Sequence, residues 1–115
     1  LGRATIVNFW GTWCGWCLHE MPEFAEMVEH YGDDVSFLFV DYGDDEDTAR
    51  QAMEEFGIPL EKVLMDSESA VTYLYQVNGF PTTFILDEQG NIVKDIVGAT
   101  TKDEVMPIID GLLGD

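Results

Sequence analysis

The sequence predicts an α/β domain built on a mixed sheet, and two patterns along its 115 residues carry that prediction. Over the first two thirds, short apolar runs alternate with segments of helical periodicity, as in units whose strands run parallel. In the last third, two strand-like runs flank a short turn, which indicates an antiparallel hairpin. We find no repeat, low-complexity tract or linker, so we expect a single domain over residues 1–115.

The first strand is expected over residues 4–10, where ATIVNFW is apolar and rich in branched and aromatic residues. Such a run is typical of a strand buried on both faces. A helix is expected from Gly15 to about Tyr31, because apolar residues recur there every three or four positions. These residues are Leu18, Met21, Phe24, Ala25 and Val28. Gly32 supplies a stop, and Cys14 falls at or just before the first turn.

The second strand and helix follow in the same order. Residues 35–40 (VSFLFV) form an apolar run, and four acids at 44–47 suit the start of a helix that runs to about Phe56. The acids lack the alternating oxygen ligands and the distal Glu of a calcium-binding EF-hand loop. We therefore interpret them as a helix start and predict no metal site.

Two further elements precede the hairpin. A short strand is expected near residues 62–65, and a helix from about Ser67 to Tyr75, capped by Ser67 or Asp66. The hairpin strands are expected at 82–86 and 91–97, and a closing helix at 102–113. Because strands and helices alternate up to the hairpin, we expect one α/β domain with a mixed sheet.

Composition and charge exclude several classes of partner. Twenty-three acidic residues against five basic ones give a formal charge of −18, which repels nucleic acid and anionic lipid surfaces. We interpret most of this charge as a solubilising surface that favours neutral or basic partners. No apolar run reaches the ~20 residues that span a bilayer, so we predict no membrane insertion by this domain. Leu1 is neither an initiator methionine nor part of a signal peptide, and we expect a cut inside a longer chain.

The only two cysteines, Cys14 and Cys17, allow four interpretations. A structural disulfide would close a loop too short to restrict the unfolded chain much. Zinc needs about four ligands, and the chain adds only His19 and His30. A peroxidatic or hydrolytic cysteine needs no second thiol at this spacing, whereas dithiol exchange does. Spacing and context therefore favour redox exchange, with no cofactor and no metal.

The expected helix start indicates how the two cysteines divide the chemistry. Exposed N–H groups and the positive end of the helix dipole stabilise a thiolate and lower the cysteine pKa. We therefore expect Cys14 to be the nucleophile. Cys17 lies one turn further into the helix, so it should be more buried and should resolve the mixed disulfide.

These residues resemble a known family. FWGTWCGWC, followed by Glu20-Met21-Pro22 and by GFPTTF at residues 79–84, is similar to the thioredoxin superfamily and, within it, to the TlpA/ResA-like thiol-disulfide oxidoreductases. The resemblance covers nearly the whole chain. It implies a thioredoxin-like α/β fold in which helices flank both faces of a mixed central sheet.

The resemblance also implies a substrate site around the cysteines. Pro81 would follow a cis peptide bond and lie next to Cys14, and the Phe80 backbone would pair with an extended substrate chain. Without the resemblance, a trans proline at a strand start would be expected. Trp13 would flank the nucleophile, and Gly15-Trp16 occupies the pair of positions where family members tune their redox potential.

Other residues near the cysteines are expected to have different roles. Glu20 lies on the same helical face as Cys17, and related enzymes place a glutamate there that handles protons; the alternative is a solvated carboxylate. Asn8 stands where many thioredoxins have a buried aspartate, which makes Glu20 more necessary. Trp10 is interpreted as a core residue, and Pro22 should kink the helix without taking part in chemistry.

The resulting hypothesis is a bacterial thiol-disulfide oxidoreductase that acts on protein disulfides, with a reductant favoured over an oxidase or isomerase. The resemblance implies an extracytoplasmic location, periplasmic or on the outer face of the cell membrane, with an anchor or fused domains in the full-length chain. It also implies a membrane or protein electron donor, and substrates such as an apocytochrome, a copper-site assembly protein or a fused methionine sulfoxide reductase. The alternative of another class, a Sco-like copper chaperone, needs a late histidine, and none follows His30.

Overall fold

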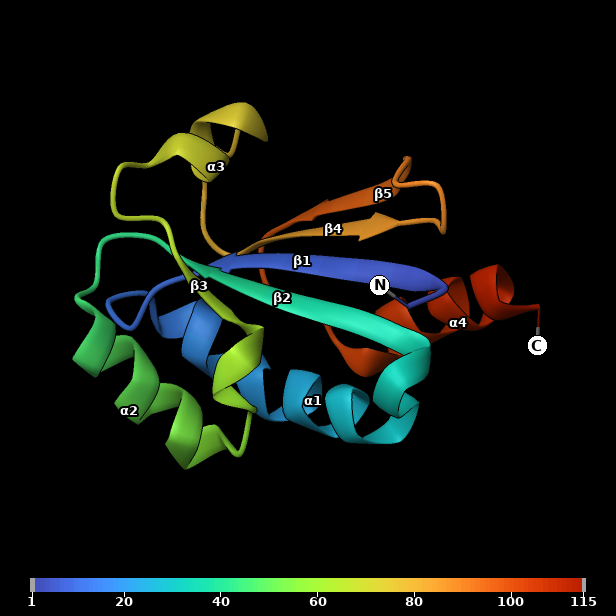
Figure 1. The fold of residues 1–115 in the computed structure, drawn as a ribbon, viewed down its shortest axis with the longest axis horizontal. Helices are drawn as coiled ribbons and strands as arrows, with labels where there is room; N and C mark the ends of the chain where they lie inside the picture. Colours follow the sequence, from blue (N-terminus) through green and yellow to red (C-terminus); the bar gives the residue numbers. More distant parts are fainter. Residues whose placement is uncertain (1, 115) are drawn as a thin grey trace.

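Five strands form one mixed sheet within residues 2–114, the part of the chain that the computed structural model describes (Figure 1). Their order in the sheet is β3-β2-β1-β4-β5. β1 (Ala4–Trp10), β2 (Val35–Asp41) and β3 (Val63–Met65) run parallel to one another. β4 (Thr82–Leu86) is antiparallel to β1, and β5 (Ile92–Val97) is antiparallel to β4. The mixed sheet predicted from the sequence is confirmed.

Helices cover both faces of this sheet, as the resemblance implies. α1 (Gly15–Tyr31), α2 (Glu46–Phe56) and α4 (Lys102–Leu113) pack on one face, and α3 (Ala70–Leu74) lies on the other (Figure 1). The two faces are covered unequally, because α3 has only five residues. The larger part of the apolar core therefore lies between the sheet and the three longer helices.

The side chains of β1 alternate between the two faces of the sheet, which explains why the strand is apolar on both faces. Ile6 and Trp10 belong to the core on the α1 side, whereas Val7 and Phe9 belong to a second cluster on the α3 side. Successive side chains of a strand point to opposite faces, so a central strand between two helical layers needs apolar residues at nearly every position. Trp10 is fully buried, which confirms its interpretation as a core residue.

The bounds predicted for α1 are confirmed at both ends. Cys14 is the N-cap residue, and its sulfur accepts a hydrogen bond from the Cys17 amide. Gly32 ends the helix with a φ of 55°, a left-handed conformation that glycine adopts without steric cost. Pro22 lies within the helix and does not end it.

The prediction for the helix near residue 70 was wrong in length and in its cap. α3 spans only Ala70–Leu74, and its N-cap is Ser69, not Ser67 or Asp66. The reason is a turn that comes first: the Ser69 amide donates to the Asp66 carbonyl, and Ser69 adopts a φ of 62°. The Asp66 carboxylate nevertheless accepts hydrogen bonds from the amides of Val71 and Thr72, so it stabilises the first turn from outside the helix.

Small shifts occur elsewhere. β5 begins at Ile92, because Asn91 is held in the hairpin turn by Asp87. The acids at 44–47 start α2 as predicted, with Asp45 as the N-cap.

Among the described residues, no helix combines the length and the apolar character that crossing a membrane requires. Leu1, where we expected a cut, lies outside the described residues.

Candidate active site

Cys14 and Cys17 form a disulfide at the N-terminus of α1. Their Cα atoms are 5.2 Å apart. Cys14 is 8% exposed and Cys17 is fully buried, so Cys14 is the more accessible of the two sulfurs, as the sequence predicts. The Cys17 amide donates to the Cys14 sulfur over 3.2 Å. An amide directed at this sulfur would also stabilise a thiolate there.

The register of the sheet brings the second part of the site to the same edge. Phe9 near the end of β1 pairs with Thr82 at the start of β4, so the chain just before Thr82 lies beside the loop that leads to Cys14. The Phe80–Pro81 peptide bond in that segment is cis. The Gly98 amide donates to the Pro81 carbonyl over 2.8 Å, which brings a third segment, after β5, to this edge.

Three aromatic rings form one cluster, and one of them belongs to Trp13, the residue before Cys14. Trp13 meets Phe80 edge to face with ring centroids 5.2 Å apart, and Tyr42 stacks on Phe80 at the same separation. Trp13 is 54% exposed, so this cluster is a surface feature. Tyr42 was not among the residues predicted for the site; its position directly after β2, at the edge of the sheet where β1 also ends, is the signal that could have indicated it.

An apolar hollow of about 320 Å³ lies beside Phe80. Its lining consists of Trp16, Phe80, Pro81, Gly98 and Ala99. Trp16 is 65% exposed and forms a wall of this hollow. Sequence analysis did not identify Gly98 or Ala99, because only the pairing of β5 with β4 places the segment after β5 beside Pro81.

Gly15 and His19 contribute to a second hollow beside Trp16. Together with Trp16 they line a shallow hollow of about 410 Å³. The Trp16 and His19 rings meet edge to face with centroids 5.3 Å apart. A Cβ built on Gly15 would meet no atom within 4 Å, so the surface is open at the position between the two cysteines.

Glu20 is buried, and the alternative of a solvated carboxylate is wrong. One carboxylate oxygen accepts a hydrogen bond from the Asn8 side-chain amide and the other from the Thr100 backbone amide, both over 2.9 Å. Burial raises the pKa of Glu20 to about 7, against the opposing effect of these two hydrogen bonds. Glu20 can therefore take up or release a proton near neutral pH.

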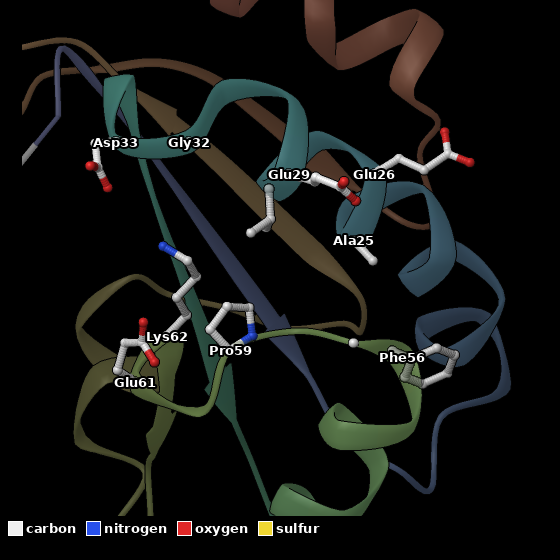
Figure 2. A pocket seen from close by; sticks show the side chains of 11 residues that line it. Ala25, Glu26, Glu29, Gly32, Asp33, Phe56, Pro59, Glu61 and Lys62 are labelled. Atoms are coloured by element: carbon white, nitrogen blue, oxygen red, sulfur yellow. The ribbon is translucent and has the colours of Figure 1, made fainter.

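A larger hollow lies elsewhere among the described residues. It measures about 600 Å³ and is lined by residues of α1, by the end of α2 and by the turn before β3 (Figure 2). Neither cysteine lines it, and neither does any of the aromatic residues around them. Size alone therefore does not mark the candidate site in this fold.

In the part of the chain that the structure describes, no group of three or more His, Cys, Asp or Glu residues is arranged to hold a metal ion.

Comparison with known proteins agrees with this geometry. The family described as Redoxin matches residues 1–112. The thiol-disulfide oxidoreductase ResA of Geobacillus thermodenitrificans is 32% identical over 112 residues, which are 96% of this chain and 64% of that protein. The chain thus spans less than two thirds of the length of this relative.

Solved structures show the same fold. A thiol:disulfide interchange protein of the thioredoxin family from Chlorobium tepidum is 27% identical, with a TM-score of 0.86 over 98% of this chain and 81% of that one. The exposed lipoprotein thioredoxin of Streptococcus pneumoniae is 26% identical, with a TM-score of 0.75 over 96% of this chain and 85% of that one. These comparisons confirm the thioredoxin-like fold.

Proposed function

The chain belongs to the Redoxin family, and from that premise we propose that it is a thiol-disulfide oxidoreductase that reduces disulfides in protein substrates through Cys14 and Cys17. The observation that carries this proposal is the Cys14–Cys17 disulfide at the N-terminus of α1, beside the Phe80–Pro81 segment and an open apolar hollow. The ResA name of the 32% identical relative supports it.

The reaction needs only the two cysteines as electron carriers. In the reduced protein, the Cys14 thiolate attacks one sulfur of the substrate disulfide, so that a Cys14–substrate bond forms and the substrate S–S bond breaks. The first substrate sulfur leaves and takes up a proton. Cys17 then loses its proton and attacks the Cys14 sulfur, which restores the Cys14–Cys17 disulfide and releases the second substrate thiol. Two electrons and two protons pass from the dithiol to the substrate.

Glu20 is the proposed proton acceptor for Cys17. Cys17 is fully buried, so water has little access to its proton. Glu20 lies three residues further along α1, on the same helical face. A general base works best when its pKa is near the operating pH, and the pKa of about 7 that burial gives Glu20 meets that condition.

The substrate is proposed to be an extended polypeptide segment that carries the disulfide. Its backbone would pair with Phe80, next to Pro81, by adding a strand-like segment at the edge of the site. The side chain beside its cysteine would enter the apolar hollow between Trp16 and Ala99. Trp13 and Gly15 would complete the surface around Cys14, because they are its neighbours in the chain and a Cβ built on Gly15 would meet no atom within 4 Å.

The same proposal includes the location of the domain and its electron donor. We place the domain outside the cytoplasm, periplasmic or on the outer face of a bacterial membrane, which the exposed lipoprotein thioredoxin among the similar structures supports. A membrane or protein electron donor would return the disulfide to the dithiol. Residues 1–115 would act as one domain, because both core clusters are built on a single sheet.

The equilibrium between the dithiol and disulfide forms tests this function. The protein is equilibrated with defined thiol buffers, and the two forms are quantified by alkylation and mass measurement, with Trp fluorescence as a second readout. A midpoint near about −250 mV or lower supports a reductant, whereas one between about −120 and −180 mV identifies an oxidase or isomerase. A pair that does not cycle reversibly refutes the proposal.

A further inference from the structure

The Trp13 indole lies in a narrow slot beside Gly11 and Gly43, and a side chain at either glycine would fill that slot. A Cβ built on Gly11 would lie 2.2 Å from the indole Nε1, and one built on Gly43 would lie 3.2 Å from the same atom. The indole N–H donates to the Tyr42 carbonyl over 2.8 Å. Trp13 is therefore held between two loops, one at the end of β1 and one at the end of β2.

A carboxylate joins the same two loops. Both oxygens of Asp44 accept hydrogen bonds from Thr12, one from its backbone amide over 2.8 Å and one from its hydroxyl over 2.7 Å. Thr12 immediately precedes Trp13, and the turn continues from there because the Cys14 amide donates to the Gly11 carbonyl. Asp44 thus holds the short segment that carries both Trp13 and Cys14.

A second carboxyl group, which is buried, binds Asp44 through a hydrogen bond. Asp41 is 1% exposed, and its Oδ1 accepts a hydrogen bond from the Asp44 amide over 3.1 Å. Two neighbouring acids, Asp44 and Asp45, affect the pKa of Asp41. The Asp66 backbone amide donates a hydrogen bond to the Asp41 backbone carbonyl. Burial, with a smaller effect of Asp44, raises the pKa of Asp41 to about 8. Asp41 is therefore mostly neutral at pH 7 and places little negative charge beside Asp44.

We infer that Asp44, supported by Asp41, is a positioning residue that holds Trp13 beside Cys14 as a fixed wall of the substrate site. The inference rests on the proposed function. Without the Asp44 carboxylate, the Thr12 amide and hydroxyl lose their partner, and the Thr12-Trp13 segment gains conformational freedom. The Trp13 indole would then leave its slot, while the chemistry of the sulfurs stays intact.

The experiment compares reduced wild type with three variants: Asp44→Ala, Asp44→Asn and Asp47→Ala. Asp47 is an exposed acid at the start of the same helix, so its variant removes an equal charge without touching Thr12. Two substrates are used, a peptide with one disulfide flanked by apolar residues, and hydroxyethyl disulfide, which carries no peptide segment beside its sulfurs. The indole N–H signal of Trp13 is followed by nitrogen-15 NMR and assigned with Trp13→Phe.

Asp44→Ala should raise KM for the peptide about fivefold or more, since each lost hydrogen bond corresponds to roughly a fivefold change. It should shift the Trp13 indole signal and leave the rate with hydroxyethyl disulfide within about twofold of the wild-type rate. Asp44→Asn keeps one acceptor for Thr12 and should lie between. Asp47→Ala should behave like wild type in every readout.

The inference is overturned if Asp44→Ala matches Asp47→Ala in peptide KM, or if the Trp13 signal does not move. If Asp44→Ala does not fold, Thr12→Val decides in its place, because it removes only the hydroxyl bond and should still shift the indole signal. Failure of wild type to reduce either disulfide would refute the proposed function, and the indole signal would still test whether Asp44 positions Trp13.

Discussion

The Asn8 side-chain amide donates to the Glu20 carboxylate over 2.9 Å inside the core. The same Asn8 amide group also donates to the Thr83 hydroxyl over 3.1 Å, whereas the Asn8 carbonyl oxygen has no hydrogen-bond partner among the described residues. A protonated Glu20 would need an acceptor, and the free carbonyl oxygen of Asn8 can supply one after a half-turn of the amide. The pair can therefore accommodate both protonation states of Glu20.

Glu20→Gln should remove a pH dependence from the exchange reaction. In wild type, the step in which Cys17 attacks Cys14 should accelerate through an inflection near pH 7, because the pKa of Glu20 is about 7. The variant should lose that inflection and be slower by roughly 100-fold at neutral pH. Glu29→Gln, which changes an exposed acid of the same helix, is the control. Stopped-flow measurement of substrate release gives the rate, and an unchanged pH profile would refute the proton role.

Asp41→Asn should alter the pH dependence of stability. The folded-state pKa of Asp41 is about 8 against an ordinary value of 3.8, so the native state binds the proton more tightly than the unfolded chain does. Stability should therefore fall as the pH rises from about 4 to about 8. The variant should be more stable than wild type at pH 8.5 by roughly 2–5 kcal/mol. Urea unfolding of the oxidised protein at pH 5 and pH 8.5 measures this, and a wild-type midpoint that does not fall with pH would contradict it.

Cys17→Ser should trap the substrate. Cys14 can still attack a disulfide, but no second thiol is present to resolve the mixed disulfide. Mass spectrometry after mixing with a disulfide-containing peptide should show a one-to-one covalent adduct that dithiothreitol removes. Cys14→Ser should form no such adduct. Equal adduct formation by both variants would show that the more exposed Cys14 is not the preferred nucleophile.

Trp16→Ala should weaken peptide binding with little effect on the dithiol equilibrium. Trp16 forms one wall of the apolar hollow and is 65% exposed, so its removal takes apolar contact area from the substrate without opening the core. We expect KM for an apolar-flanked peptide to rise about 5- to 30-fold, in keeping with ~1–2 kcal/mol of lost burial. Tyr73→Ala is the matched control, because Tyr73 is 85% exposed and lies on α3. Equal KM values in the two variants would exclude the hollow as a substrate pocket.

Gly11→Ala should displace the Trp13 indole. The added Cβ would lie 2.2 Å from Nε1, closer than any stable contact, and the indole is the group that can move. The Trp13 bond to the Tyr42 carbonyl should break, with a loss of roughly 1–3 kcal/mol of stability from overpacking. Thermal unfolding and the Trp13 indole signal measure both effects. Gly15→Ala is the control, because its Cβ meets no atom within 4 Å.

The sequence predicted most of the fold because its signals are local. The bounds of β1 and α1 agree with the structure at every end, since an apolar run, a helical period and Gly32 each act over a few residues. The prediction of a helix from Ser67 was wrong because the turn at Ser69 depends on a left-handed φ that no local pattern indicated. The resemblance, and not composition or spacing, implied the cis bond before Pro81 that the structure contains.

The sequence by itself determined which residues form the disulfide, because Cys14 and Cys17 are the only cysteines and lie at a helix start that the local pattern predicts. Only the tertiary structure decided how Glu20 behaves, because its burial and its bond to the Thr100 amide depend on a segment eighty residues away. The same holds for Asp44, whose bond to Thr12 exists because β1 and β2 end side by side. A pKa and the position of a loop are set by neighbours in space, and those neighbours come from the packing of the whole sheet.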